Sequence, residues 1–234
     1  MKNTGSIEKI NFKVGQMNKI IGMTIRMMFG FLLCACGTVL ALNSKLGLSP
    51  WDVFHQGLTN VINITMGQAS IVIGIVIVLI SSIMGVRIGL ATIANMIMIG
   101  FFIDLVSYID IIPVSSNIFS GIIMMIGSLF SQAFGTYLYI GCGMGCGPRD
   151  GLMVALVRIT GKSVRLIRFV IEMCALTIGY FLGGKAGIGT VITVFGIGYC
   201  VQLVFKMFNF DVNELKHKDI KEGIRSIRQL IVNS

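Results

Sequence analysis

The ionisable residues that interrupt the apolar parts of this sequence gather in two short segments of similar composition. Residues 50–55 contain a proline, a tryptophan, an aspartate and a histidine, and residues 148–150 read Pro-Arg-Asp. Indole, carboxylate, imidazole and guanidinium groups, brought together, could form a site for a small solute or an ion. The candidate ligand-binding residues are Trp51, Asp52, His55, Arg149, Asp150 and Glu172.

Each of the two segments has the pattern of a helix start. Pro50 and Pro148 suit the first helical position, because its backbone N–H would be unpaired in any case. Ser49 and Gly147 then occupy the cap position. The aspartates at positions 52 and 150 fall at the third helical position, where a carboxylate can accept backbone N–H groups. We predict that two helices begin at these candidate residues.

Both helices are predicted to run for about 10 to 14 residues, which is too short to span a bilayer. Two arrangements fit. As re-entrant half-helices entering from opposite faces, they would bring Trp51, Asp52, Arg149 and Asp150 together near the midplane, with positive dipole ends. Arg149 would then neutralise one of the aspartates, since an unpaired buried charge is costly. As interfacial helices, they would lie at the two surfaces with Arg149 facing headgroups.

Two further candidates have both a functional and a structural interpretation. His55 lies four residues after Trp51 on the same helical face, so it could titrate or bind a ligand, or it could line a polar pocket. Glu172 lies within an apolar stretch, where a carboxylate is a functional candidate. The alternative for Glu172 is a salt bridge to Arg168, four residues earlier.

The composition predicts the elements that must position these residues. Hydrophobic residues make up 55% of the 234 residues and charged residues only 12%, whereas a soluble domain carries about 25% charged residues. This excludes a soluble globular protein and predicts an all-α, polytopic membrane protein. Six apolar stretches are long enough to span. They are residues 20–42, 68–85, 88–109, 118–140, 164–183 and 187–208.

The charge distribution predicts the orientation. With the N-terminus inside, every Lys and Arg except Lys45 and Lys185 falls on the cytoplasmic side, which places both termini in the cytoplasm. Residues 1–19 form a basic N-terminal tail, and residues 209–234 form a basic C-terminal tail with an isoleucine stripe at helical spacing. That pattern predicts a helix resting on anionic lipid headgroups. Binding of a partner protein is equally compatible with it, and nucleic acid is not expected.

The chain also contains an internal repeat. Shifting the sequence by 98 residues aligns Gly47, Pro50 and Asp52 with Gly145, Pro148 and Asp150. The middle of the repeat needs a shift of four residues, which pairs Gly67 with Gly161. The repeats are residues 20–110 and 117–208. Because each contains three predicted spans, the second must be inverted relative to the first, as in many secondary transporters.

The segments Leu46–Leu58 and Gly145–Met153, with their two proline-aspartate motifs, resemble the bacterial YczE/YyaS/YitT-type integral membrane proteins. The resemblance covers residues 20 to 208 and implies a multi-pass protein of the bacterial cytoplasmic membrane. It implies no mechanism.

Together these features favour a transporter-like protein that moves or binds a small solute or ion at a central site between the repeats. The alternative is a non-transporting accessory or regulatory protein that binds a partner through its basic tails. No enzyme, cofactor or metal site is predicted, because no catalytic or ligand-spacing motif is found. Association with a second copy as a homodimer is left open.

Overall fold

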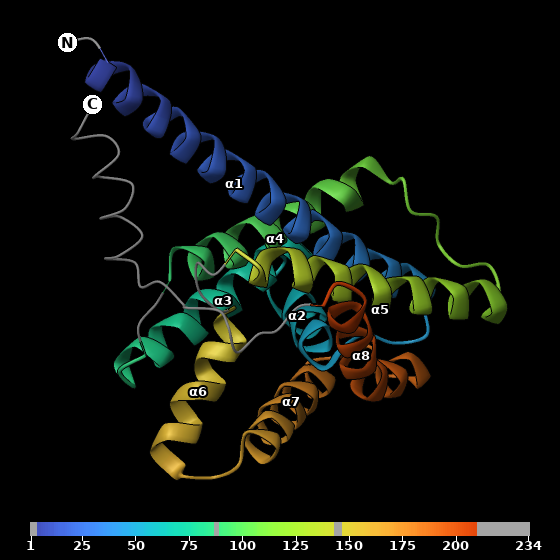
Figure 1. Ribbon diagram of the computed structural model, residues 1–234. Helices are drawn as coiled ribbons and strands as arrows, with labels where there is room; N and C mark the ends of the chain where they lie inside the picture. Colours follow the sequence, from blue (N-terminus) through green and yellow to red (C-terminus); the bar gives the residue numbers. More distant parts are fainter. Residues whose placement is uncertain (1–3, 87–88, 143–146, 210–234) are drawn as a thin grey trace.

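The computed structural model describes residues 4–86, 89–142 and 147–209, and every regular element within them is a helix (Figure 1). This confirms the predicted all-α class. The helices are α1 (Thr4–Ser44), α2 (Pro50–Val61), α3 (Met66–Ile83), α4 (Leu90–Ile109), α5 (Ile118–Ile140), α6 (Pro148–Thr160), α7 (Val164–Phe181) and α8 (Ile188–Met207).

Five of these helices contain stretches that are long and apolar enough to cross a membrane. They are Ile20–Ser44 of α1, Met66–Ile83, Thr92–Ile109, Ile118–Ile140 and Ile188–Met207. Each lies within a few residues of a predicted span. The sixth predicted span, residues 164–183, is helical as α7 but is not one of these five, because Arg165, Arg168 and Glu172 interrupt its apolar character.

The ends of the helices are set by local capping interactions. Thr65 caps α3 by accepting from the backbone N–H of Gln68, whose side chain accepts from the backbone N–H of Thr65 in return. Ser163 occupies the N-cap position of α7, and its side chain accepts from the backbone N–H of Leu166. These bonds satisfy amide groups that have no partner within the helix.

The first helix is longer than its spanning part. Residues 4–19, which the sequence suggested as a separate tail, continue α1 as one helix that reaches beyond the other helices at its N-terminal end (Figure 1). The C-terminal tail was predicted for residues 209–234, and residues 210–234 lie outside the described residues.

Helices α1 and α5 form the centre of the bundle and pack antiparallel. A Cβ atom at Gly30 would lie 2.9 Å from the backbone oxygen of Gly135, and one at Gly37 would lie 3.0 Å from the backbone oxygen of Ser128. Later positions on α1 thus meet earlier positions on α5. Side chains larger than hydrogen would force the two backbones apart, so these glycines allow the close approach.

The helix bounds repeat along the chain. Helices α2, α3 and α4 begin at residues 50, 66 and 90, and α6, α7 and α8 begin at 148, 164 and 188, which is 98 residues later in each case. Gly85 and Gly183, also 98 residues apart, follow α3 and α7 with positive φ angles of 82° and 86°. The further four-residue shift expected from the sequence is wrong, because the intervening helices keep the same spacing.

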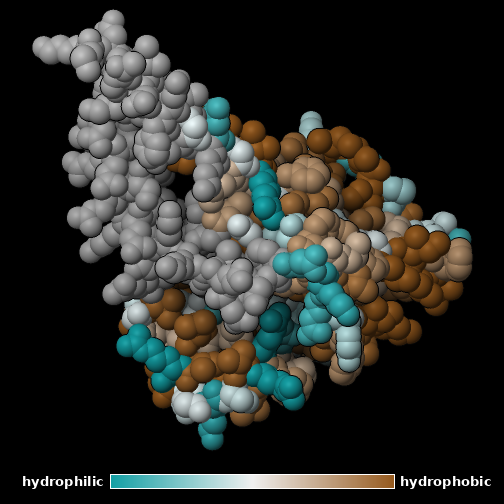
Figure 2. Space-filling view, in the orientation of Figure 1, coloured by the Kyte–Doolittle hydropathy of each residue, from teal (hydrophilic) through white to brown (hydrophobic). Residues whose placement is uncertain are grey.

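Large apolar side chains remain exposed along the outer faces of the helices. Examples on α3, α4, α5 and α8 are Leu79, Phe101, Ile123 and Phe195. Figure 2 shows that such residues cover broad areas of the described surface. An apolar exterior of this extent suits contact with lipid rather than water.

Candidate functional site

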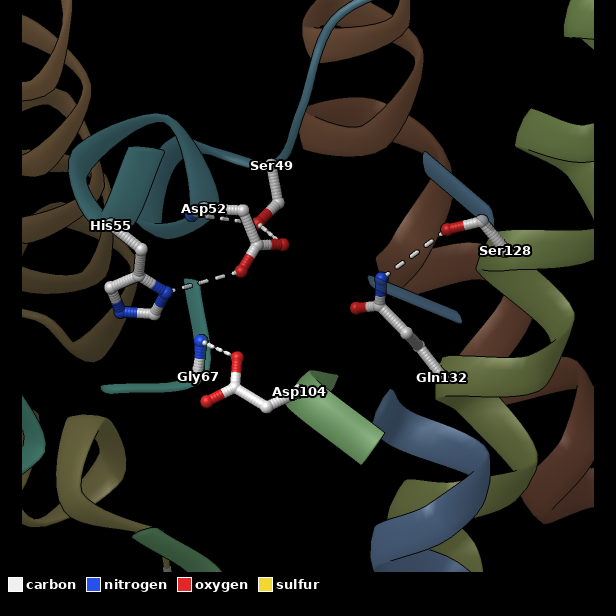
Figure 3. Close-up of polar contacts among 7 residues, drawn as sticks. All are labelled: Ser49, Asp52, His55, Gly67, Asp104, Ser128 and Gln132. Atoms are coloured by element: carbon white, nitrogen blue, oxygen red, sulfur yellow. Dashed lines mark hydrogen bonds and ion pairs between the residues drawn. The ribbon is translucent and has the colours of Figure 1, made fainter. Parts of the chain in front are cut away.

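The first part of the candidate site is the buried start of α2. Ser49 caps the helix: its hydroxyl accepts the backbone N–H of Asp52 at 3.3 Å. The same hydroxyl donates to Oδ2 of the Asp52 carboxylate at 2.6 Å (Figure 3). Pro50 occupies the first turn, as predicted. Only 4% of Asp52 is exposed, so the carboxylate is stabilised by its own helix start rather than by water.

The second oxygen of the same carboxylate faces the histidine on the next turn. Oδ1 of Asp52 lies 3.4 Å from Nδ1 of His55, and 2% of the His55 side chain is exposed. Nδ1 makes no hydrogen bond in the structure, although it is fully buried. Figure 3 shows the imidazole turned toward the carboxylate. The pair is therefore close enough to interact electrostatically but lacks a formed hydrogen bond.

The start of α6 meets the start of α2. The guanidinium carbon of Arg149 lies 5.0 Å from the centre of the Trp51 ring, which is a cation–π contact. The sequence suggested instead that Arg149 pairs with an aspartate. Among the described residues, Arg149 has no ion pair within 4.0 Å, although it is near enough to act on Asp52 and Asp150 electrostatically.

Gly147 and Asp150 form the cap region of α6. Gly147 occupies the cap position and Pro148 the first turn, as predicted. The backbone of Gly147 is a hydrogen-bond partner of the Asp150 carboxylate. A Cβ at Gly147 would lie 3.7 Å from Oδ1 of Asn95 on α4, so α4 also borders this part of the site. The preceding residues 143–146 lie outside the described part of the chain.

The indole of Trp51 packs at the middle of two longer helices. It forms a buried cluster with Ile73 and Ile77 of α3 and with Ala175 of α7, whereas α3 extends from Met66 to Ile83. The other end of α2 lies near the end of α7, where the side-chain amide of Asn60 donates to the backbone oxygen of Gly183 at 2.8 Å. Val53, two residues after Trp51, already lies against Gly179 and Gly184. Helix α2 therefore lies along the C-terminal end of α7, while the Trp51 side chain packs against the middle of α3.

The chain that leads into α2 is held against the start of α8. The backbone N–H of Gly189 donates to the backbone oxygen of Leu46 at 2.8 Å. Gly47 has a φ of 119°, and a Cβ there would lie 2.6 Å from the backbone nitrogen of Gly187. Only glycine adopts this backbone conformation readily and leaves room for the contact.

Glu172 is not part of the cluster around Trp51. Its carboxylate oxygen lies 3.2 Å from Nε of Arg168, and the two side chains are 25% and 60% exposed. This is the i,i+4 pair that the sequence offered as the structural alternative.

Asp104 is a further polar residue, which was not among the predicted candidates. One carboxylate oxygen accepts the Thr65 hydroxyl at 2.5 Å, and the other accepts the backbone N–H of Gly67 at 2.8 Å (Figure 3 shows the second bond). Asp104 thus joins α4 to the start of α3. A carboxylate inside an apolar span is a signal that could have identified Asp104 from the sequence. Its partners could not be predicted, because they lie 37 and 39 residues away along the chain.

The fold defines a polytopic helical membrane protein with polar side chains at two short helix starts. Those of α2 (Ser49, Asp52 and His55) are buried. At the start of α6, Arg149 is exposed and Asp150 is half-buried. Residues 21–206 match the model of a family of unknown function, DUF6198, and the chain belongs to this family. It is 34% identical over 176 residues to an uncharacterized protein of Haemophilus influenzae, covering 75% of this chain and 80% of the relative.

Two proteins of Bacillus subtilis are also similar to this chain. The uncharacterized membrane protein YczE is 35% identical over 177 residues, with 74% of this chain and 80% of the relative covered. The uncharacterized protein YyaS is 26% identical over 171 residues, with 70% and 83% covered. The predicted YczE-type resemblance is therefore confirmed. No solved structure matches the chain.

Proposed function

We propose that this protein binds a small polar solute or ion at a central site between two inverted repeats and moves it across the bacterial cytoplasmic membrane. The observation that carries the proposal is the contact between Trp51 and Arg149, at 5.0 Å. These two residues occupy equivalent places 98 positions apart, each next to the proline that starts a short helix. Equivalent residues touch each other only where the two halves meet.

Reciprocal contacts support a two-fold relation between the halves. The Gly30–Gly135 approach has its counterpart, under the 98-residue shift, in the Gly37–Ser128 approach. Two hydrogen bonds between the same helices join residues that are 98 positions apart. The Ser131 hydroxyl donates to the backbone oxygen of Leu33, and the Cys34 thiol donates to the backbone oxygen of Gln132. A two-fold rotation exchanges partners in this way.

The antiparallel packing of α1 and α5 supports inversion in particular. Both helices are spanning candidates, and each is the first helix of its half. If both cross the bilayer, they cross in opposite directions. The two halves then have opposite topology, as in transporters built from inverted repeats.

The depth of the site supports the re-entrant interpretation of α2. Trp51 packs against Ile73 and Ile77 near the middle of the spanning candidate α3. Irregular backbone at that depth is tolerated where it is buried in protein or lines a cavity. The short helices then direct their positive N-terminal ends, and the side chains of Asp52 and Arg149, toward a solute near the midplane.

The test uses the fact that Trp51 is the single tryptophan of the chain. Purified protein in lipid nanodiscs is titrated with a panel of small organic anions, organic cations and inorganic ions while indole emission is recorded. We expect a saturable change with one solute class, and a loss of that change in Arg149→Gln. Arg158→Gln, on the last turn of the same helix, is the matched control and should respond like the wild type. Equal responses in all three proteins would contradict the proposal.

The alternative proposal is an accessory protein that binds a partner through its basic tails. Its motivation is the concentration of Lys and Arg in residues 1–19 and 209–234. Deleting residues 212–234 should abolish function under this alternative, with Asp52→Asn and Asp150→Asn harmless. The central-site proposal predicts that Asp52→Asn and Asp150→Asn abolish function in the same cellular assay and that the deletion of residues 212–234 is harmless.

A further inference from the structure

A buried acid–base pair lies within the proposed solute site. Asp52 and His55 are 4% and 2% exposed. Their facing atoms, Oδ1 and Nδ1, lie 3.4 Å apart. In a membrane interior, a carboxylate without a full set of partners is costly and is retained where it has a function.

The partners of the Asp52 carboxylate are divided unequally. Oδ2 accepts a short hydrogen bond from the Ser49 hydroxyl at 2.6 Å. Oδ1 faces His55, whose Nδ1 has no hydrogen-bond partner. With a proton on Nδ1, the imidazolium and the carboxylate would form an ion pair, because the two atoms lie 3.4 Å apart.

No other described group competes for this position. The charged groups that act on Asp52 are His55 and Arg149. Arg149, from α6, rests over the Trp51 ring. Helix α3 contains no ionisable residue. On α7, Glu172 lies one turn and Arg168 two turns before Ala175, where α7 packs against Trp51, and the two charged side chains pair with each other.

We infer that Asp52 and His55 together bind one exchangeable proton, and that this proton is the coupling ion of the central site. The inference deepens the proposed function, on which its coupling role rests. Asp52 lies next to Trp51. A change in the net charge of the Asp52–His55 pair therefore alters the electrostatic potential where the solute is proposed to bind. Proton uptake would reduce the negative charge beside the Arg149–Trp51 contact. Proton release would restore that charge and favour a cationic partner there.

The experiment measures proton binding directly, in the absence of any solute. The chain has two histidines, so His217→Gln leaves His55 as the single imidazole. Its ring nitrogens are labelled with ¹⁵N, and their chemical shifts are followed by NMR in nanodiscs from about pH 8 to about pH 5. We expect Nδ1 to become protonated in this range. Asp52→Asn should weaken proton binding by at least about tenfold, which is one pH unit in the transition.

Two further variants keep the test decisive if Asp52→Asn does not fold. Ser49→Ala retains the carboxylate but removes the donor to Oδ2, so the pair should bind its proton more tightly than in the wild type. Asp110→Asn changes an exposed carboxylate beyond the end of α4 and should leave the transition unchanged.

The outcomes separate this inference from the proposed function. A His55 ring that stays neutral throughout, or a transition that is the same in Asp52→Asn, Ser49→Ala and wild type, overturns the proton site. Solute-dependent Trp51 emission without His55 titration would leave the central site in place and remove only the proton. Titration of His55 without any solute response would retain the proton site and remove its coupling role.

Discussion

Packing between α2 and α7 controls where the candidate site lies, and one substitution tests this directly. A Cβ at Gly179 would overlap the backbone nitrogen of Phe54 and lie 2.6 Å from the backbone carbonyl carbon of Val53. Both atoms belong to the backbone of α2, so no side chain can rotate away. Ordinary contacts begin at 3.4 Å. Gly179→Ala therefore moves α2 away from α7 by about 1 Å.

The expected cost follows from this overlap. Inserting a methyl group into a closely packed contact costs about 1–3 kcal/mol of folding free energy. For a chain of this size, that lowers the midpoint of thermal unfolding by roughly 2–12 °C. The emission of Trp51 should also shift, because Trp51 lies one turn before Phe54 on the helix that is displaced.

The assay is thermal unfolding in nanodiscs, followed by circular dichroism and by Trp51 emission. Gly198→Ala is the matched control, because a Cβ at this helical position on α8 meets nothing within 4 Å. Alanine is favoured over glycine inside a helix by about 0.5–1 kcal/mol, so the control should be as stable as the wild type or more so. If Gly179→Ala unfolds at the same temperature as Gly198→Ala, the close α2–α7 packing described here is wrong.

Three other substitutions separate structural from functional roles. Asp104→Asn removes an acceptor at the start of α3 and should cost about 1–3 kcal/mol in unfolding experiments, with Asp110→Asn neutral; equal stability of the two would contradict the capping role. Ser49→Ala removes a helix cap and should cost about 0.5–2 kcal/mol, with Ser49→Thr close to wild type; no loss would mean that the Asp52 carboxylate caps α2 alone. Glu172→Gln breaks only an exposed pair with Arg168 and should cost less than about 1 kcal/mol, without loss of the Trp51 response; loss of that response would bring Glu172 into the site.

Much of the architecture could be predicted from the sequence because the bilayer imposes strong rules. Apolar stretches of about 20 residues must be helices in lipid, so residues 118–140 were predicted with the bounds that α5 has in the structure. The starts of α2 and α6 were also predicted correctly, since Pro50 and Pro148 are local signals that act without tertiary context.

The parts that were missed depend on contacts between distant residues. Arg149 was expected to pair with an aspartate, but its position over Trp51 is set by how α6 packs against α3 and α7. Asp104 was overlooked because Gly67 becomes its partner only after α3 folds back on α4. The four-residue shift in the repeat was inferred from one pair of glycines, Gly67 and Gly161, whereas the helix bounds follow from the capping pattern.

The measurement that tests the central claim most directly is the sidedness of two equivalent loops. In a cysteine-free background, single cysteines replace Asn63, between α2 and α3, and Lys162, between α6 and α7; both positions are exposed. Gly161 is avoided because its φ of 65° disfavours a side chain. Labelling uses a membrane-impermeant thiol reagent on intact cells and on inverted vesicles. Inverted repeats predict that position 63 reacts only in intact cells and position 162 only in inverted vesicles. Reaction of both from the same side would contradict the inversion and, with it, a site formed by two half-helices from opposite faces.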